Sequence, residues 1–296
     1  MEKPVHLKAS FLNNRKFLPY LLISPAMVLY GFFVLYPIVQ NLWFSFFHWT
    51  SFTNKTFNGL ENYLTLTSDK VFWAALFHNL IWAGLTLAFP LLIGLILSSL
   101  LFRSKYRVFF SSIYYLPTTV PLVVSGIMWG WIYNPLFGLL NFTLENMGLQ
   151  VFKRNWLAEP NIALYALNVL GAWTFFGFCT IIFINALQNI DVSIYEAAKI
   201  DGASNVQSFF HITIPTLKNT IAFLSIYSII GAMKFFDIIY ITTDGGPGYS
   251  TEILGTYIFK LVFRQQKVGL GSAVAVILFI IVSIMSLLIL RRRNNE

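Results

Sequence analysis

The sequence predicts an all-α, polytopic membrane protein with six transmembrane helices. Hydrophobic residues make up 57% of its 296 residues and charged residues only 11%, whereas a soluble domain carries about 25% charged residues. The mean hydropathy of +0.68 agrees with this balance. The chain lacks the charge to coat a surface that faces water, so we expect the lipid bilayer to be its main solvent.

Polar stretches separate six apolar runs, each of which is long enough to cross a bilayer, for which an α-helix needs ~20 residues. The predicted spans cover about residues 17–47, 72–102, 108–133, 162–187, 220–242 and 268–290. A polar, basic tail of residues 1–16 precedes them, and a basic tail of residues 291–296 follows. The first run is too long for a signal peptide and is predicted to be a retained span. Its prolines, Pro19, Pro25 and Pro37, are expected to bend it.

The distribution of basic residues predicts the orientation. Six spans place both termini on one side of the membrane, together with the connections that follow the second and fourth spans. Twelve Lys and Arg residues lie on that side and seven on the other. Because cytoplasmic connections are enriched in Lys and Arg, we expect both termini in the cytoplasm of a bacterial cell. The same enrichment explains the net charge of +8 better than binding to nucleic acid does.

The connection between the fourth and fifth predicted spans, residues 191–219, is called the elbow here. It is polar but keeps a helical pattern. Two pairs of residues have the spacing of a capping box: Ser193 with Glu196, and Ser204 with Gln207. Gly202 between them predicts a sharp turn. The elbow is therefore predicted to form a helix, a turn and a second helix, which Pro215 ends.

No residue pattern indicates catalysis or a resident cofactor. The only cysteine, Cys179, lies in an apolar run, and the four histidines do not have metal-ligand spacing. Gly245, Gly246 and Pro247 lack the Lys-Ser/Thr pair of a phosphate-binding loop, and they predict a tight turn on the outer side. We therefore expect a protein that is not itself catalytic and has no metal site.

Two charged residues fall within the fifth predicted span. Lys234 and Asp237 are three residues apart, so they share one face of a helix and can pair. Intramembrane charges often mark an ion pathway, and an ion-coupled carrier that works alone is one interpretation. The alternatives are a structural ion pair or two charges that face a wet cavity.

The elbow carries a recognisable spaced motif. Glu196-Ala197-Ala198 is followed by three residues, Gly202, nine residues and Ile212-Thr213-Ile214-Pro215. This pattern resembles the EAA motif in permease subunits of bacterial binding-protein-dependent ABC importers, with Ile214 where leucine is usual. The resemblance implies that the elbow is a coupling helix that docks on a cytoplasmic ATPase subunit. The residues that it assigns to this coupling are Glu196, Ala197, Ala198, Asp201, Gly202 and Pro215.

A second resemblance narrows the family. The runs from Phe236 to Tyr240 and from Thr243 to Pro247, with Tyr257-Ile258-Phe259 after them, are similar to the outer loop of carbohydrate importers of the maltose and glycerol-3-phosphate type. Within that type, the chain resembles the first of two non-identical permeases. The resemblance implies three partners: a second homologous permease, two copies of an ATPase that bind ATP and Mg, and an extracytoplasmic solute-binding protein. It also weakens the interpretation of Lys234 and Asp237 as a proton relay.

The same resemblance implies a path for the sugar. Alignment with the maltose-type permease places this path near residues 173–178 of the fourth span and 228–232 of the fifth. The expected path residues are Trp173, Phe175, Phe178, Ser228 and Ala232. The chain departs from the maltose-type pattern at Phe175, Phe178 and Ala232, where glycine, tyrosine and asparagine are usual. These changes remove polar sugar contacts, so either the pocket belongs mostly to the second permease or the substrate differs. The identity of the sugar therefore does not follow from the resemblance.

Overall fold

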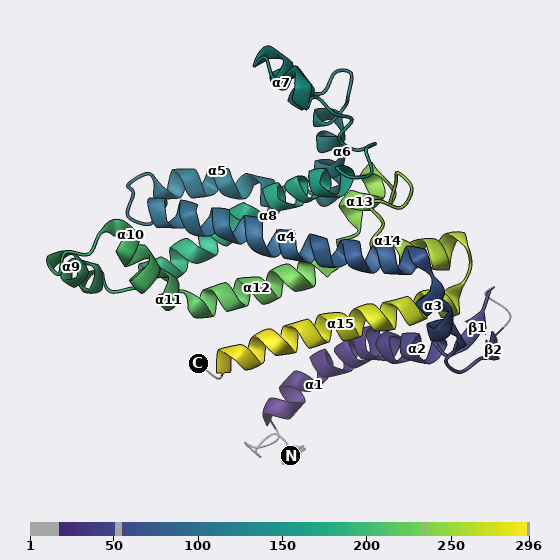
Figure 1. Cartoon of the computed structure of the whole chain (residues 1–296). Coiled ribbons are helices and arrows are strands. Elements are labelled where there is room, and N and C mark those ends of the chain that lie inside the picture. Colours follow the sequence, from purple (N-terminus) through teal and green to yellow (C-terminus); the bar gives the residue numbers. More distant parts are fainter. Residues whose placement is uncertain (1–17, 51–54, 234, 295–296) are drawn as a thin grey trace, which may run out of the picture.

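The computed structural model describes residues 18–50, 55–233 and 235–294. Four long helices, α4, α8, α12 and α15, run side by side and form the body of the molecule (Figure 1). The elbow lies at one end of these helices, and a small β-hairpin lies with α3 at the other. The predicted tail of residues 1–16 lies outside the described residues, and α15 extends into the predicted C-terminal tail as far as Asn294.

The elements follow one another in a mainly helical order. The first half contains α1 (Leu18–Tyr30), the π-helix η1 (Gly31–Leu35), α2 (Tyr36–Phe44), β1 (Phe47–Trp49), β2 (Lys55–Phe57), α3 (Glu61–Ser68), α4 (Lys70–Leu101), α5 (Arg107–Thr119), α6 (Leu122–Ile132), α7 (Leu139–Asn146) and the 3-10 helix η2 (Gln150–Phe152). The second half contains α8 (Ala163–Gln188), α9 (Val192–Ile200), α10 (Asn205–Ser208), the π-helix η3 (Phe209–Thr213), α11 (Ile214–Thr216), α12 (Lys218–Met233), α13 (Asp237–Thr242), α14 (Leu254–Phe259), the π-helix η4 (Lys260–Arg264) and α15 (Val268–Asn294).

The described residues contain five helical segments that are long and apolar enough to cross a membrane. They are Pro19–Phe44, Lys70–Leu101, Ala163–Gln188, Lys218–Thr242 and Val268–Leu288. The third predicted span, residues 108–133, is not one straight helix, because α5 and α6 meet at 95°. Val120 adopts an extended backbone (φ −78°, ψ 128°) directly before Pro121. A residue before proline is pushed out of the α region, which explains the break.

The helices pack closely where small residues face a neighbour. A Cβ atom on Gly177 of α8 would lie 1.8 Å from the carbonyl oxygen of Tyr114 in α5, and one on Gly94 of α4 would lie 2.7 Å from the Cβ of Cys179. The Thr118 hydroxyl also donates a hydrogen bond of 2.8 Å to the carbonyl of Thr174. Small residues and interhelical hydrogen bonds are the usual means by which helices associate in lipid. They hold α4 and α5 against α8.

The connection after the first helical segment is more ordered than the polar loop that the sequence predicts. The strands β1 and β2 pair antiparallel, with Phe47 opposite Phe57. The Asn62 side chain donates hydrogen bonds to the carbonyls of Ser45 and Phe47, at 2.8 and 2.9 Å. These bonds fix the hairpin to α3 beside the start of α15.

Candidate functional site

The elbow begins with a capped helix, but the cap is not the predicted one. Asp191 is the N-cap of α9, and its carboxylate accepts a hydrogen bond of 2.9 Å from the backbone N–H of Ser193. This bond holds the pKa of Asp191 below its ordinary value. The predicted capping box of Ser193 and Glu196 is therefore wrong, because helix α9 starts two residues earlier than that box requires. An aspartate is as good an N-cap as a serine.

Glu196 lies on an exposed face of α9, between the apolar residues Val192 and Ile200 and beside the polar residues Ser193 and Lys199. Val192 and Ile200 are four residues on either side of it, so they share its face, and they are 54% and 87% exposed. Glu196 and Ala197 are themselves exposed, and Ala198 is half-buried. Two large apolar side chains exposed on either side of a carboxylate form a surface that a partner protein could cover.

Tyr195 attaches the opposite side of α9 to the membrane helices. Its hydroxyl lies 3.0 Å from the hydroxyl of Thr213, and its ring lies 6.2 Å from the ring of Phe102. The guanidinium of Arg103 lies 4.8 Å from the centre of the same ring. These contacts fix α9 against the connection between α4 and α5. A force applied to the exposed face would therefore reach the long helices.

Gly202 makes the predicted turn. Its φ angle is +82°, a conformation that glycine adopts without steric cost. The second predicted capping box is confirmed, since Ser204 accepts from the Gln207 N–H and the Gln207 side chain accepts from the Ser204 N–H. Asp201 is the C-cap of α9 and lines a cavity of about 420 Å³ between the two helices of the elbow.

Pro215 does not end the second helix of the elbow. It lies within α11, and the Leu217 N–H donates to the Thr213 carbonyl at 3.0 Å, so helical turns continue into α12. The π-helix η3 ends two residues before this proline. The extra residue in that turn accommodates the missing N–H and the ring, which would clash with a regular α-helix.

The predicted path residues do not gather at one place. Phe175 and Phe178 of α8 stack with Tyr227 of α12, with ring centres 5.8 and 5.1 Å apart. Tyr227, whose side chain is 49% exposed, was not among the predicted path residues. Its spacing of four residues from exposed Phe223 is the only signal that the sequence offered. These four rings, Phe175, Phe178, Phe223 and Tyr227, are called the aromatic stack here.

The other three predicted path residues lie elsewhere. Trp173 packs against Trp129 of α6 at a ring distance of 5.7 Å and lines an apolar cavity of about 580 Å³. Ser228 and Ala232 are buried, at 2% and 1% exposure. Their side chains share a face of α12 that packs inside the molecule. In this conformation they contribute to the core and do not line an open path.

The geometry of the proposed charge pair is only partly described. Lys234 lies outside the described residues. Asp237 is exposed and begins α13, after Phe235 and Phe236, which are not helical. In the described backbone, α12 and α13 therefore do not form one regular helix. The predicted shared face of Lys234 and Asp237 requires such a helix.

The loop of residues 243–253, which the sequence predicts on the outer side, is closely packed. Gly245 has a φ angle of +81°, and a Cβ atom there would lie 2.0 Å from a carboxylate oxygen of Glu252. The Thr251 hydroxyl donates to the carbonyl of Gly246 at 2.7 Å, and the peptide before Pro247 is cis. The tight turn predicted for these three residues is what the structure shows.

Glu252 holds this loop and was missed by sequence reasoning. Its side chain is fully buried, and one carboxylate oxygen lies 2.5 Å from the ammonium of Lys260. The same ammonium donates to the Asp244 carbonyl at 2.7 Å. Arg264 pairs with the Asp244 carboxylate at 2.6 Å, which raises the pKa of Arg264. Only the fold brings these residues together.

Comparison with known proteins identifies the family. Residues 90–295 match the family described as binding-protein-dependent transport system inner membrane component. A probable ABC transporter permease of Bacillus subtilis (strain 168) is 36% identical over 280 residues, which are 93% of this chain and 96% of that protein. The chain belongs to this family of ABC transporter permeases. It is a multi-pass protein of the inner membrane.

Two further comparisons extend the similarity. A lactose transport system permease of Rhizobium radiobacter is 35% identical and covers 91% of each chain. A chain of a bacterial alginate ABC transporter, solved in complex with an alginate pentasaccharide-bound periplasmic protein, has a TM-score of 0.81 at 22% identity and covers 93% of each chain. The latter similarity confirms the predicted fold, an all-α polytopic permease.

Proposed function

We propose that this permease forms part of the translocation path of an ATP-driven importer for a carbohydrate, and that its elbow docks on a cytoplasmic ATPase. The observation that carries the proposal is the exposed face of Val192, Glu196 and Ile200. A carboxylate flanked by two apolar side chains suits a partner that offers a basic residue beside an apolar surface. The contacts of Tyr195 on the opposite side support transmission to the spans.

The proposal of a carbohydrate as substrate has two supports. One relative is a lactose permease, and a protein of the same fold belongs to an alginate transporter. The aromatic stack of Phe175, Phe178, Tyr227 and Phe223 offers flat rings, and one of them carries a hydroxyl. The C–H face of a sugar suits such rings. We propose that a mono- or oligosaccharide or a glycoside passes along this stack.

The proposed assembly contains four kinds of component. A second homologous permease completes the path, and two ATPase copies bind ATP and Mg, so that this chain itself needs no cofactor. An extracytoplasmic solute-binding protein delivers the substrate. The elbow, the termini and the connection after α4 lie in the cytoplasm, and the hairpin end lies outside. Closure of the ATPase subunits moves the elbow, and the spans alternate between inward-open and outward-open states.

Charge reversal at the elbow tests the proposal. We expect Glu196→Lys to lower both sugar uptake and ATP hydrolysis stimulated by the binding protein by on the order of tenfold or more, because like charges would then meet at the interface. Gly202→Pro should have the same effect, since proline cannot adopt a φ of +82°. The measurements are uptake in cells and hydrolysis by the assembly in lipid.

Glu145→Lys is the matched control, because Glu145 is an exposed acid on α7, away from the elbow. Its uptake should equal that of the wild type. Equal amounts of each variant in the membrane fraction exclude a folding defect. Normal uptake in both elbow variants would refute the docking role.

The ion-coupled carrier based on Lys234 and Asp237 is not favoured. Asp237 is exposed at the first position of a short helix, and the family is defined by dependence on a binding protein. Uptake that requires ATP and survives an uncoupler would eliminate this carrier.

A further inference from the structure

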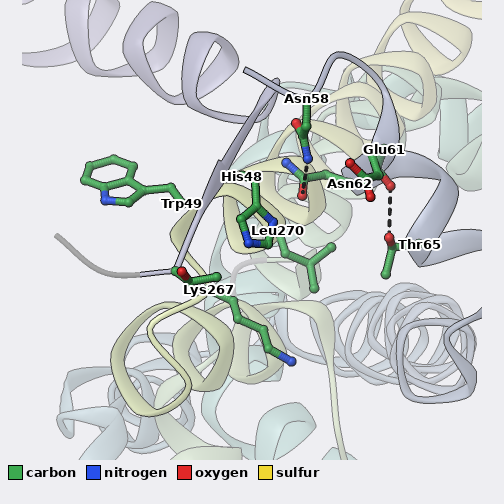
Figure 2. Close-up of a pocket in the computed structure, with 9 residues that line it drawn as sticks. His48, Trp49, Asn58, Glu61, Asn62, Thr65, Lys267 and Leu270 are labelled. Carbon is green, nitrogen blue, oxygen red and sulfur yellow. Dashed lines mark hydrogen bonds between the residues drawn. The ribbon is translucent and has the colours of Figure 1, made fainter. Parts of the chain in front are cut away.

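Two neighbouring pockets lie at the hairpin end of the molecule, opposite the elbow. The first, of about 220 Å³, is formed by the hairpin, α3 and the start of α15 (Figure 2). The second, of about 570 Å³, lies between α3, η4 and α15 and is called the basic pocket here. Thr65, Lys267 and Leu270 line both pockets. Lys267 therefore lies where the two pockets meet.

The charged residues that line the basic pocket are mostly cationic, and two of the three cations are paired with acids beside the pocket. Lys260, Arg264 and Lys267 line it, and Asp69 is its only acidic residue among the lining residues. Asp69 is already engaged, because its carboxylate accepts hydrogen bonds from two backbone N–H groups at the start of α4 and from the Tyr257 hydroxyl. Its charge is thus offset locally.

The three basic residues differ in what they offer a ligand. Lys260 is 14% exposed and is bound to buried Glu252. One guanidinium nitrogen of Arg264 is bound to Asp244, and this side chain is 47% exposed. Lys267 is exposed, and it forms no ion pair within the part of the chain that the structure describes. Lys267 is the cation available to an incoming group, with the remaining N–H groups of Arg264 beside it in the same pocket.

Backbone hydrogen bonds fix the turn that carries these residues before any partner arrives. The Gln265 N–H donates to the Lys260 carbonyl at 2.8 Å, and the Lys267 N–H donates to the Leu261 carbonyl at 2.7 Å. Gln266 between them has a φ of +56°. A turn fixed in this way lowers the entropy that binding would otherwise cost.

We propose that the basic pocket receives an acidic side chain of the extracytoplasmic solute-binding protein, with Lys267 as the main charge partner. This inference rests on the proposed function, which places the hairpin end outside the cell. The pocket is lined by polar side chains such as Thr65, Ser68 and Gln265, which suit a compact, hydrated carboxylate. A charge at the rim of an interface mainly affects association and register. Lys267 therefore acts on docking and not on the chemistry of transport.

The test compares Lys267→Glu with Lys70→Glu in the complete assembly in lipid nanodiscs. The binding protein encoded beside the permease, loaded with its sugar, is titrated while ATP hydrolysis is measured. We expect Lys267→Glu to raise the half-maximal concentration of binding protein at least tenfold, without changing the rate at saturation. Lys70 is exposed at the same end but does not line the basic pocket. Lys70→Glu should therefore change that concentration less than twofold.

A carbodiimide cross-link identifies the chemistry of the partner. This reagent joins an amine directly to a carboxylate, so wild-type Lys267 should become linked to an Asp or Glu of the binding protein, as peptide mass spectrometry would show. Lys267→Arg should abolish this cross-link and retain stimulation. Equal titrations for the two charge-reversed variants, or no cross-link at Lys267, would overturn the proposal while leaving the proposed function intact.

Two other outcomes are distinguishable. If replacing anionic lipid by neutral lipid in the nanodisc reproduces the defect of Lys267→Glu, and no cross-link forms, the pocket binds a lipid headgroup and the proposal is wrong. If the wild-type assembly is not stimulated by any loaded binding protein, both this proposal and the proposed function fail.

Discussion

Gly177 determines how closely α5 approaches α8. A Cβ atom there would lie 1.8 Å from the carbonyl oxygen of Tyr114, and backbone cannot yield as a flexible side chain can. We expect Gly177→Ala to destabilise the protein by about 1–3 kcal/mol, the usual cost of overpacking a close contact. The measurement is the apparent melting temperature of the detergent-solubilised permease, followed by size-exclusion chromatography after heating.

Gly84→Ala is the matched control for that substitution. Gly84 also lies within a long membrane helix, α4, but nothing is within 4 Å of the Cβ atom that alanine would add. Alanine has the higher helix propensity, so this variant should be at least as stable as the wild type. Equal melting temperatures for the two variants would show that α5 shifts away from α8 without cost.

At the scale of elements, the buried pair of Glu252 and Lys260 holds the outer loop against the start of η4. Removing one partner leaves the other charge without compensation, which costs about 3–5 kcal/mol for a buried pair. We expect Glu252→Ala to lower the melting temperature and to increase proteolysis within residues 243–253. Glu252→Gln should do less harm, because an amide oxygen can still accept from the Lys260 ammonium, which lies 2.5 Å from the present carboxylate.

A double-mutant cycle separates this pair from its surroundings. If the charges stabilise the loop through each other, Glu252→Ala and Lys260→Met together should cost less than the sum of the two single changes. Additive costs would show that Glu252 acts through other contacts. The hydrogen bond of 2.9 Å between His78 Nδ1 and the backbone carbonyl of Glu252 is not among them, because both substitutions retain it.

Local signals in the sequence predicted most helices and missed how they are joined. Apolar length located the five long spans, and Gly202 with Ser204 and Gln207 located the turn of the elbow. Proline was harder to interpret. Pro121 breaks a span, whereas Pro37 and Pro215 lie in helices that continue across them. In both of these cases a π-helical turn ends two residues before the proline. Such a turn depends on packing, which a local sequence pattern does not record.

At the scale of the whole molecule, the sequence predicts candidate sites that are continuous in the chain and misses those that the fold assembles. The spaced elbow motif is continuous in the chain, so sequence could find it. The aromatic stack joins α8 to Tyr227 of α12, and the basic pocket joins residues of α3 to Lys267. No local pattern predicts either site, because their members lie far apart in the chain and only the packed helices bring them together.

The orientation of the whole molecule is open to a direct test. Figure 1 places the elbow and the hairpin at opposite ends of the long helices, so a reagent that cannot cross the membrane should reach only one of them. Cys179 is the only cysteine and is fully buried, so the wild-type chain should remain unlabelled. We expect an impermeant maleimide to label Thr56→Cys in intact cells, because Thr56 is exposed in β2.

Asn205→Cys provides the opposite arm of this test. Asn205 is exposed in α10 of the elbow, so this variant should be labelled only after the membrane is opened. The chain is expressed without the ATPase so that docking does not hide the site. Labelling of Asn205→Cys in intact cells would invert the orientation that twelve basic residues against seven predict. It would also place the Glu196 face beyond the reach of any cytoplasmic ATPase. If only Thr56→Cys is labelled in intact cells, the basic pocket lies on the side where a binding protein can reach it.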